Sequence, residues 1–211
     1  GGSVANFQRG FDRINVPSVL TTLVTDELDF PNLSMVGVDD RAAAYTAVDY
    51  LIRQGHRKIA VLGGPVTSYP SLMRRKGAQQ AMEDAGILFN DKLYGLSNYD
   101  FESAYHAMNS LLARRAEFTA LFAMSDVIAF GAIRALVSAG LRVPEDVSVI
   151  GFDGITMSRY CVPVMTTIVQ PSEQIALQSI ELLVRQIEHG SPAQTVTLQP
   201  ELQQGESVRA I

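Results

Sequence analysis

The chain has 211 residues, of which 47% are hydrophobic and 18% charged, a composition typical of a folded globular protein rather than a disordered one. Its formal net charge of −5 argues against nucleic-acid binding by this segment, because such domains usually carry a concentrated basic face. The single cysteine, Cys161, excludes an internal disulfide framework and favours a reducing compartment. No apolar run approaches the roughly 20 residues of a membrane span, and no secretory signal opens the chain. These features predict a soluble, cytoplasmic protein.

Strand-like and helix-like segments alternate along most of the chain, from about residue 34 to residue 170. The expected strands are 18–24, 34–38, 58–62, 93–96, 119–123, 147–150 and 195–198. The expected helices are a short piece near Gln8, a segment that ends before Gly55, one that ends near Gly86, 101–115, one that stops at Gly140, and 171–189. Repeated strand–helix–strand units predict an α/β fold with a parallel sheet covered by helices on both faces.

Apolar residues at helical spacing predict which face of three helices is buried. The expected buried stripes are Ala44, Ala47, Val48, Leu51 and Ile52 in the first, Ala129, Ala132, Ile133, Leu136 and Val137 in the second, and Ala176, Ile180, Leu183, Val184 and Ile187 in the last.

The most informative segment is Val143-Pro144-Glu145-Asp146-Val147-Ser148-Val149-Ile150-Gly151-Phe152-Asp153. A polar turn opens onto a β-branched run that suits a strand buried on both faces of a parallel sheet. Asp153 then stands just past the carboxyl end of this strand, at the edge where open α/β sheets bind ligands. Further on, Thr166-Thr167 is expected to turn the chain.

This segment, together with Gly55-His56-Arg57-Lys58-Ile59 and Arg74-x-x-Gly77, closely resembles the effector-binding domain of the lactose-repressor/galactose-repressor family of bacterial transcription regulators. The resemblance implies a periplasmic-binding-protein-like type I fold: two doubly wound parallel-sheet subdomains, joined by three crossovers, with a ligand cleft between them. It assigns 1–38 and 171–192 to a partial N-terminal subdomain, 39–170 and 193–205 to the C-terminal subdomain, and 206–211 to a tail. The first subdomain would then be incomplete, so we expect an N-terminally truncated fragment without the DNA-binding headpiece.

Arg74 and Asp153 are the main candidates for ligand contact. Cations in the first turns of a helix oppose its dipole, so helix propensity does not explain Arg74, whereas the family's matching arginine points into the cleft. A guanidinium offers forked donors to vicinal hydroxyls or a carboxylate, and a carboxylate accepts from sugar hydroxyls. A solvated surface arginine and a loop-capping aspartate are the structural alternatives. We expect the two side chains to face each other across one polar cleft.

Four further residues are candidates for ligand binding. Ser125-Asp126 opens a helix, where either residue could cap it. The family usually has Asn-Asp there, with the asparagine touching ligand, so the serine puts that contact in doubt. Tyr99 occupies the place of an aromatic residue that stacks on ligand in many members, although it could equally be a core or surface aromatic. Asp39 begins a crossover, where it could serve as a hinge or contact ligand.

Enzyme activity finds no support in the sequence. The three histidines have no metal-ligand spacing with one another or with Cys161, and His56 is expected to be structural. No Gly-x-Ser-x-Gly elbow, phosphate loop or dinucleotide fingerprint is present. The sequence therefore predicts no enzyme, no cofactor and no metal site.

The resemblance implies a small-molecule-sensing domain of a homodimeric regulator, with a sugar or sugar derivative as the favoured effector. Binding would shift the population between two subdomain arrangements and so change operator affinity through the absent headpiece. Tyr99 keeps a nucleobase as an alternative ligand. The alternative functions are a sugar-binding solute receptor of a transporter, which shares the fold, and a doubly wound enzyme with an unrecognised site.

Overall fold

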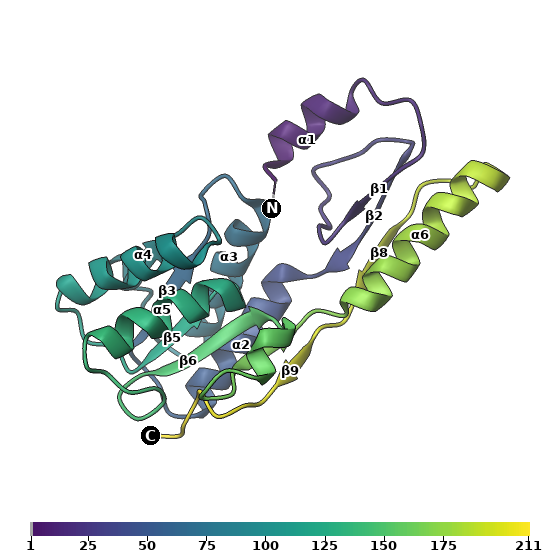
Figure 1. Ribbon diagram of the computed structural model, residues 1–211. Helices are drawn as coiled ribbons and strands as arrows, with labels where there is room; N and C mark the ends of the chain where they lie inside the picture. Colours follow the sequence, from purple (N-terminus) through teal and green to yellow (C-terminus); the bar gives the residue numbers. More distant parts are fainter. Residues whose placement is uncertain (1) are drawn as a thin grey trace. The chain divides into compact units, whose positions relative to one another are not determined.

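The chain folds into two units, shown in Figure 1 as a computed structural model that describes residues 2–211. Residue 1, the first of the predicted N-terminal subdomain, lies outside the described residues. Unit 1 comprises the residues up to Asp39, Thr67–Pro70 and Gln170–Pro200, and unit 2 comprises Asp40–Val66, Ser71–Val169 and Glu201–Ile211. The chain passes between the units after Asp39, Val169 and Pro200, and the short segment Thr67–Pro70 also groups with unit 1.

Unit 2 is built on a six-stranded sheet in the order β4-β3-β5-β6-β7-β9. The strands are β3 (Ile59–Gly63), β4 (Tyr94–Leu96), β5 (Ala120–Ala123), β6 (Ser148–Asp153), β7 (Thr166–Val169) and β9 (Glu201–Gln203). Neighbouring strands are parallel except for the antiparallel pair β7 and β9. Every residue of β3 and β5 is buried, as parallel strands covered on both faces require.

The helices that cover this sheet are α2 (Asp40–Arg53), α3 (Tyr69–Asp84), α4 (Phe101–Ala113) and α5 (Asp126–Ser138), with short 3-10 helices η1 (Asp91–Leu93) and η2 (Thr156–Arg159). Right-handed crossovers place α3 on one face and α4 and α5 on the other, and Figure 1 shows α4 and α5 lying side by side. The predicted α/β fold class is therefore confirmed. No helix within residues 2–211 combines the length and the hydropathy that crossing a membrane requires.

The predicted buried stripes of α2 and α5 are largely correct. Ala44, Ala47, Val48 and Leu51 are buried and Ile52 packs against the same core, as predicted. In α5 the prediction is wrong for Val137, which is 52% exposed. The helix instead turns Ile128 and Ala135 towards the sheet, so its buried face lies about one position earlier in each turn than predicted.

Unit 1 contains the three-stranded parallel sheet β1-β2-β8. Its elements are α1 (Val4–Phe11), β1 (Ser18–Thr21), β2 (Leu33–Val38), α6 (Ser172–His189) and β8 (Thr195–Leu198).

The predicted stripe of α6 is on the wrong face. The buried residues are Ile175, Ser179, Leu182 and Gln186, and Gln186 accepts a hydrogen bond from the buried Ser34 hydroxyl of β2 at 3.1 Å. Ala176, Ile180, Val184 and Ile187 are exposed and Leu183 is half-buried. Two stripes of similar periodicity run along this helix. The stripe that packs on β1 and β2 includes the polar residues Ser179 and Gln186. Both are hydrogen-bonded, Ser179 to the Ile175 carbonyl and Gln186 to the Ser34 hydroxyl.

The C-terminal segments differ from the prediction in two ways. The predicted segment 193–205 is divided, because β8 pairs with β2 in unit 1 whereas β9 pairs with β7 in unit 2. The predicted tail, 206–211, is packed: the buried Ser207 hydroxyl donates to the Val149 carbonyl at 2.6 Å, and the Ile211 amide donates to the Gln54 carbonyl at 2.9 Å.

Two further predictions concern single positions. Thr166-Thr167 was expected to form a turn, but both residues lie fully buried in β7. The prediction of a turn is wrong because Thr166–Val169 are four consecutive β-branched residues, which favour a strand. His56 is structural, as predicted: its ring nitrogens contact the Thr119 hydroxyl at 2.9 Å and the Arg209 carbonyl at 3.1 Å. Burial lowers the pKa of this imidazole and favours its neutral form.

Candidate functional site

Polar side chains of unit 2 gather at one edge of its sheet. Arg74 lies in α3, which follows β3, and Tyr99 follows β4. Asp126 opens α5 directly after β5, and Asp153 ends β6. Since these strands are parallel, their carboxyl ends share an edge, and that edge is where open α/β sheets bind ligands.

The guanidinium of Arg74 is the centre of this cluster. The residue is only 5% exposed, and its Nε donates to Asp40 Oδ1 at 2.7 Å. Its Nη1 donates to the carbonyl of Met124, and its Cζ lies 3.6 Å from the centroid of the Phe152 ring. Burial acts to lower the pKa of this group, but Asp40 and Asp153 outweigh burial and raise it. Arg74 is therefore a fixed, buried cation that is held by a carboxylate, a carbonyl and an aromatic face.

Asp153 faces Arg74, as predicted, with 3.6 Å between Asp153 Oδ1 and Arg74 Nη1. Unlike Arg74, the Asp153 side chain is 28% exposed, so this carboxylate is the accessible member of the pair. Its backbone φ of 114° is rare for a residue with a side chain. Such strained positions cost about 1–3 kcal/mol and cluster at functional sites.

Asp126 is buried, and both of its carboxylate oxygens accept hydrogen bonds from other residues of unit 2. Its Oδ1 accepts from the Thr167 hydroxyl at 2.6 Å, and its Oδ2 accepts from the Ile155 amide at 2.8 Å. Burial raises the pKa of this carboxyl to about 6, although both hydrogen bonds oppose that change. A side chain on Gly151 would place its Cβ 2.2 Å from Asp126 Oδ1, so only glycine leaves room for the carboxylate. This contact explains why the Gly151-Phe152-Asp153 motif begins with glycine.

The glycine of Arg74-x-x-Gly77 has a similar role. A Cβ on Gly77 would lie 2.1 Å from the carbonyl oxygen of Arg41, so the bare glycine allows α3 to approach the first turn of α2. Asp40 is the first residue of α2. Arg74 lies three residues before Gly77 in the same helix. The close approach of α3 to α2 therefore brings the Asp40 carboxylate to the Arg74 guanidinium.

Three other predicted site residues have different environments. The Tyr99 hydroxyl is one of two buried side-chain polar atoms within residues 2–211 that have no hydrogen-bond partner, and its backbone φ is 59°. The Ser125 hydroxyl accepts from the Ile128 amide at 3.1 Å and caps α5, which supports the structural alternative for this residue. Asp39 is exposed and is the last residue of its segment in unit 1, whereas its neighbour Asp40 pairs with Arg74.

The sequence reasoning missed three contributors to the cluster: Asp40, Phe152 and Thr167. Asp39 was the expected candidate, but it is its neighbour Asp40 that starts a helix. An acid in a first turn is the available signal for Asp40. Thr167 was obscured by the expectation of a turn. Phe152 gave no signal, because an aromatic residue in a buried strand ordinarily packs in the core.

No group of three His, Cys, Asp or Glu side chains within residues 2–211 is arranged to hold a metal ion. Among the charged groups of this cluster, the Asp153 carboxylate is more exposed than the Arg74 and Asp40 side chains. Comparison with known proteins identifies the family. Residues 48–208 match the model of the periplasmic binding protein-like domain, and the chain is 31% identical to a sugar-binding transcriptional regulator of the LacI family from Escherichia coli, solved in complex with phosphate. The chain belongs to the LacI family.

This LacI-family structure superposes with a TM-score of 0.82, and the match covers 99% of this chain and 74% of that one. A solved complex of the regulator CelR with cellobiose has a TM-score of 0.82 at 28% identity, covering 96% of this chain and 69% of that one. Among curated relatives, the HTH-type transcriptional regulator MalR of Clostridium butyricum is 37% identical over 209 residues, 98% of this chain. The chain spans 62% of the length of that relative. These relatives are regulators, and the chain corresponds to their effector-binding domain.

The first prediction concerns the protonation of Asp126. Its folded pKa of about 6 exceeds the ordinary value of 3.8, so the folded state binds this proton more tightly. Protonation of Asp126 therefore stabilises the folded state below pH 3.8. This contribution to the free energy of unfolding, about 3 kcal/mol, is lost as the pH rises through about 6. We expect Asp126→Asn to lack this loss. Urea unfolding of both proteins across this pH range measures it, and the contribution of His56 cancels in the difference. Parallel stability curves would contradict the expectation.

The second prediction concerns backbone strain at Asp153. Asp153→Gly and Asp153→Ala both remove the carboxylate, but only glycine adopts a positive φ without strain. We expect the glycine variant to be more stable than the alanine variant by about 1 kcal/mol, despite the greater chain entropy of unfolded glycine. Chemical denaturation measures the difference. Alanine equal to or more stable than glycine would show that this backbone carries no strain.

Proposed function

We propose that this chain is the effector-sensing part of a bacterial DNA-binding regulator, and that it binds a neutral polyhydroxylated molecule, a sugar or sugar derivative, at the carboxyl edge of the unit 2 sheet. The observation that carries the proposal is the buried Arg74 beside the accessible Asp153, 3.6 Å away. A fixed pair of donor and acceptor suits hydroxyl groups, which both donate and accept.

The charge of the cluster favours a neutral ligand over an anion. Arg74 contributes one positive charge, whereas Asp40 and Asp153 contribute two negative ones, and Asp40 already holds the guanidinium at 2.7 Å. A phosphate or carboxylate would meet a net negative charge in a site where water is partly excluded. A neutral sugar avoids this repulsion and can still accept from Arg74 and donate to Asp153.

Tyr99 supports the same ligand class. A buried hydroxyl without a partner costs about 1–3 kcal/mol, and a ligand hydroxyl would satisfy that of Tyr99 once the loop after β4 moves to admit it. One side of the ring packs on Gly64, where an added Cβ would lie 2.0 Å from Tyr99 Cε2, so a sugar ring would stack on the other side. A nucleobase would use the same surface, but it offers fewer hydroxyls to Asp153.

In the whole protein, effector binding would change operator affinity through a DNA-binding segment outside this chain. The net charge of −5 supports the view that these residues do not themselves bind DNA. Binding would act by favouring one of two arrangements of the protein, since a ligand shifts an equilibrium only through its differential affinity. The rival function, a solute receptor of a transporter, shares the fold, but the relatives named above are regulators.

Binding measurements test the proposed effector class. In a thermal-shift and calorimetric screen we expect a neutral sugar to bind and its phosphorylated form to bind more weakly. Asp153→Asn should weaken binding by about 2 kcal/mol through loss of a charged acceptor, and Tyr99→Phe by about 1 kcal/mol. Glu83→Gln, which removes an exposed carboxylate on α3 away from the site, serves as the control. Tighter binding of the phosphorylated form, or unchanged affinity in both site variants, would refute the proposal.

A homodimer is part of the proposal, and an apolar groove on unit 2 supports it. Ile133, Val137, Leu141 and Pro163 help to line this groove of about 420 Å³. Val162, which is 94% exposed, also lines it, together with the charged residues Arg142 and Glu145. Because the protruding side chain and the hollow lie on the same face, two copies can pair with each other reciprocally, as a two-fold interface requires.

Sedimentation velocity tests the dimer. We expect Val162→Asp to shift the protein towards monomer, because each interface would bury two uncompensated carboxylates. Leu88→Asp introduces the same charge at a site that is 90% exposed and remote from the groove, and it should leave the dimer intact. A monomeric wild type at micromolar concentration, or equal effects of the two variants, would exclude this interface.

A further inference from the structure

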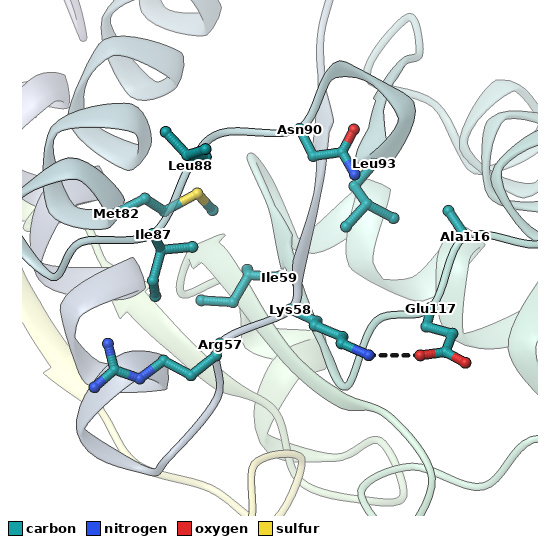
Figure 2. Close-up of a pocket in the computed structure, with 10 residues that line it drawn as sticks. All are labelled: Arg57, Lys58, Ile59, Met82, Ile87, Leu88, Asn90, Leu93, Ala116 and Glu117. Carbon is teal, nitrogen blue, oxygen red and sulfur yellow. Dashed lines mark hydrogen bonds and ion pairs between the residues drawn. The ribbon is translucent and has the colours of Figure 1, made fainter.

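A second cavity lies at the opposite edge of the unit 2 sheet, where β3 and β5 begin. It has a volume of about 380 Å³, within the range of small-molecule sites. Figure 2 shows the residues that line it: Arg57, Lys58, Ile59, Met82, Ile87, Leu88, Asn90, Leu93, Ala116 and Glu117. The length of β3, about 13 Å at the usual rise per residue, separates this edge from the one that carries Arg74 and Asp153.

The base of the cavity is apolar. Ile59, Met82 and Leu93 are each at least 94% buried and expose only a small part of their side chains to it. Ile87 and Ala116 extend this surface towards the opening. Leu88 is 90% exposed at the rim, where burial against an apolar guest would gain about 25 cal/mol for each Å² covered.

Backbone hydrogen bonds hold two walls of the cavity in place. Helix α3 ends in a Schellman motif, in which the Ile87 amide donates to the Met82 carbonyl at 2.8 Å and the Gly86 amide donates to the Glu83 carbonyl at 2.9 Å. On the other wall, Asn90 Oδ1 accepts from the Lys92 amide at 3.0 Å and caps η1. The cavity is therefore formed before any ligand enters, which lowers the entropic cost of binding.

The opening carries two cations and one carboxylate. Lys58 pairs with Glu117 across it (Figure 2), and both side chains are mainly exposed. Exposed ion pairs of this kind contribute little to stability, so Lys58 can exchange Glu117 for another anion at small cost. Arg57 is anchored through Nη1 to the Ala85 carbonyl at 2.9 Å and adds a second positive charge.

We propose that this cavity is a second ligand site, which takes a small organic anion with an apolar body and a single carboxylate. The apolar body fills the base over Ile59, Met82 and Leu93, and the carboxylate lies at the opening beside Lys58. This ligand is anionic and largely apolar, whereas the ligand proposed for the Arg74 edge, where the net charge is negative, is neutral and carries many hydroxyl groups. The two sites are therefore chemically distinguishable, and the second does not depend on the proposed function.

Nuclear magnetic resonance titration of the protein with phenylacetate and with its neutral analogue phenylacetamide tests the site. We expect phenylacetate to shift the methyl signals of Ile59, Ile87 and Leu93 in a saturable way. The amide should bind about fivefold more weakly, a ratio that corresponds to about 1 kcal/mol for one exposed charge pair.

Two rim variants should act in opposite directions. Lys58→Met keeps the apolar stem but removes the charge, so it should reduce the preference for the acid over the amide, with Arg57 as the remaining cation. Glu117→Gln should strengthen phenylacetate binding, because it removes the competing carboxylate, and should leave the amide unaffected. Lys92→Met, which removes an exposed lysine outside the lining, is the matched control and should change neither affinity.

The proposal fails if these methyl signals do not shift or never saturate. It also fails if acid and amide bind equally well, or if Lys58→Met and Lys92→Met behave alike.

Discussion

The pairing of Arg74 with Asp40 is the contact on which the candidate site depends. A buried guanidinium is tolerated only when its charge and hydrogen bonds are satisfied, and Asp40, the Met124 carbonyl and the Phe152 ring together meet that need. These partners come from α2, from the residue after β5, and from β6. One cation therefore links three segments that are far apart in the sequence, and their relative placement determines where Asp153 stands.

The same reasoning separates residues that support the site from those that can contact a ligand. Asp126, Thr167 and Ser125 have buried hydrogen-bond partners, so their task is to hold the loops at the carboxyl ends of β5 and β6. Asp153 is partly accessible and the Tyr99 hydroxyl lacks a partner among the described residues. An effector would therefore meet the accessible Asp153 carboxylate on a base that is held by buried hydrogen bonds, which is the arrangement that specific binding requires.

Much of this could be predicted from the sequence. Alternation of strands and helices gave the α/β class, and the Val143–Asp153 segment placed a carboxylate at the correct edge of the sheet. Arg74 was singled out by its unfavourable charge near a helix start and by the resemblance of Arg74-x-x-Gly77 to the family's pattern, although α3 begins at Tyr69 and so places Arg74 beyond the first turn. Propensity did not reveal Asp40 as its partner, since that pairing depends on how closely α3 approaches α2. The face of α6 was mispredicted because apolar periodicity cannot rank two similar stripes, and hydrogen bonds such as that from Ser34 to Gln186 decide between them.

Two of the crowded glycines limit how such a site can change over evolutionary time. At Gly77 and Gly151 the space that a side chain would need is already occupied by the Arg41 carbonyl and the Asp126 carboxylate. Substitution of either glycine would displace these groups and destabilise the fold, so it is a poor route to a change in ligand specificity. The loop after β4, which carries Tyr99, contains no glycine of this kind. New effector preferences in related sensors would therefore arise mainly by exchange of residues in this loop, while the glycines and the buried cation persist.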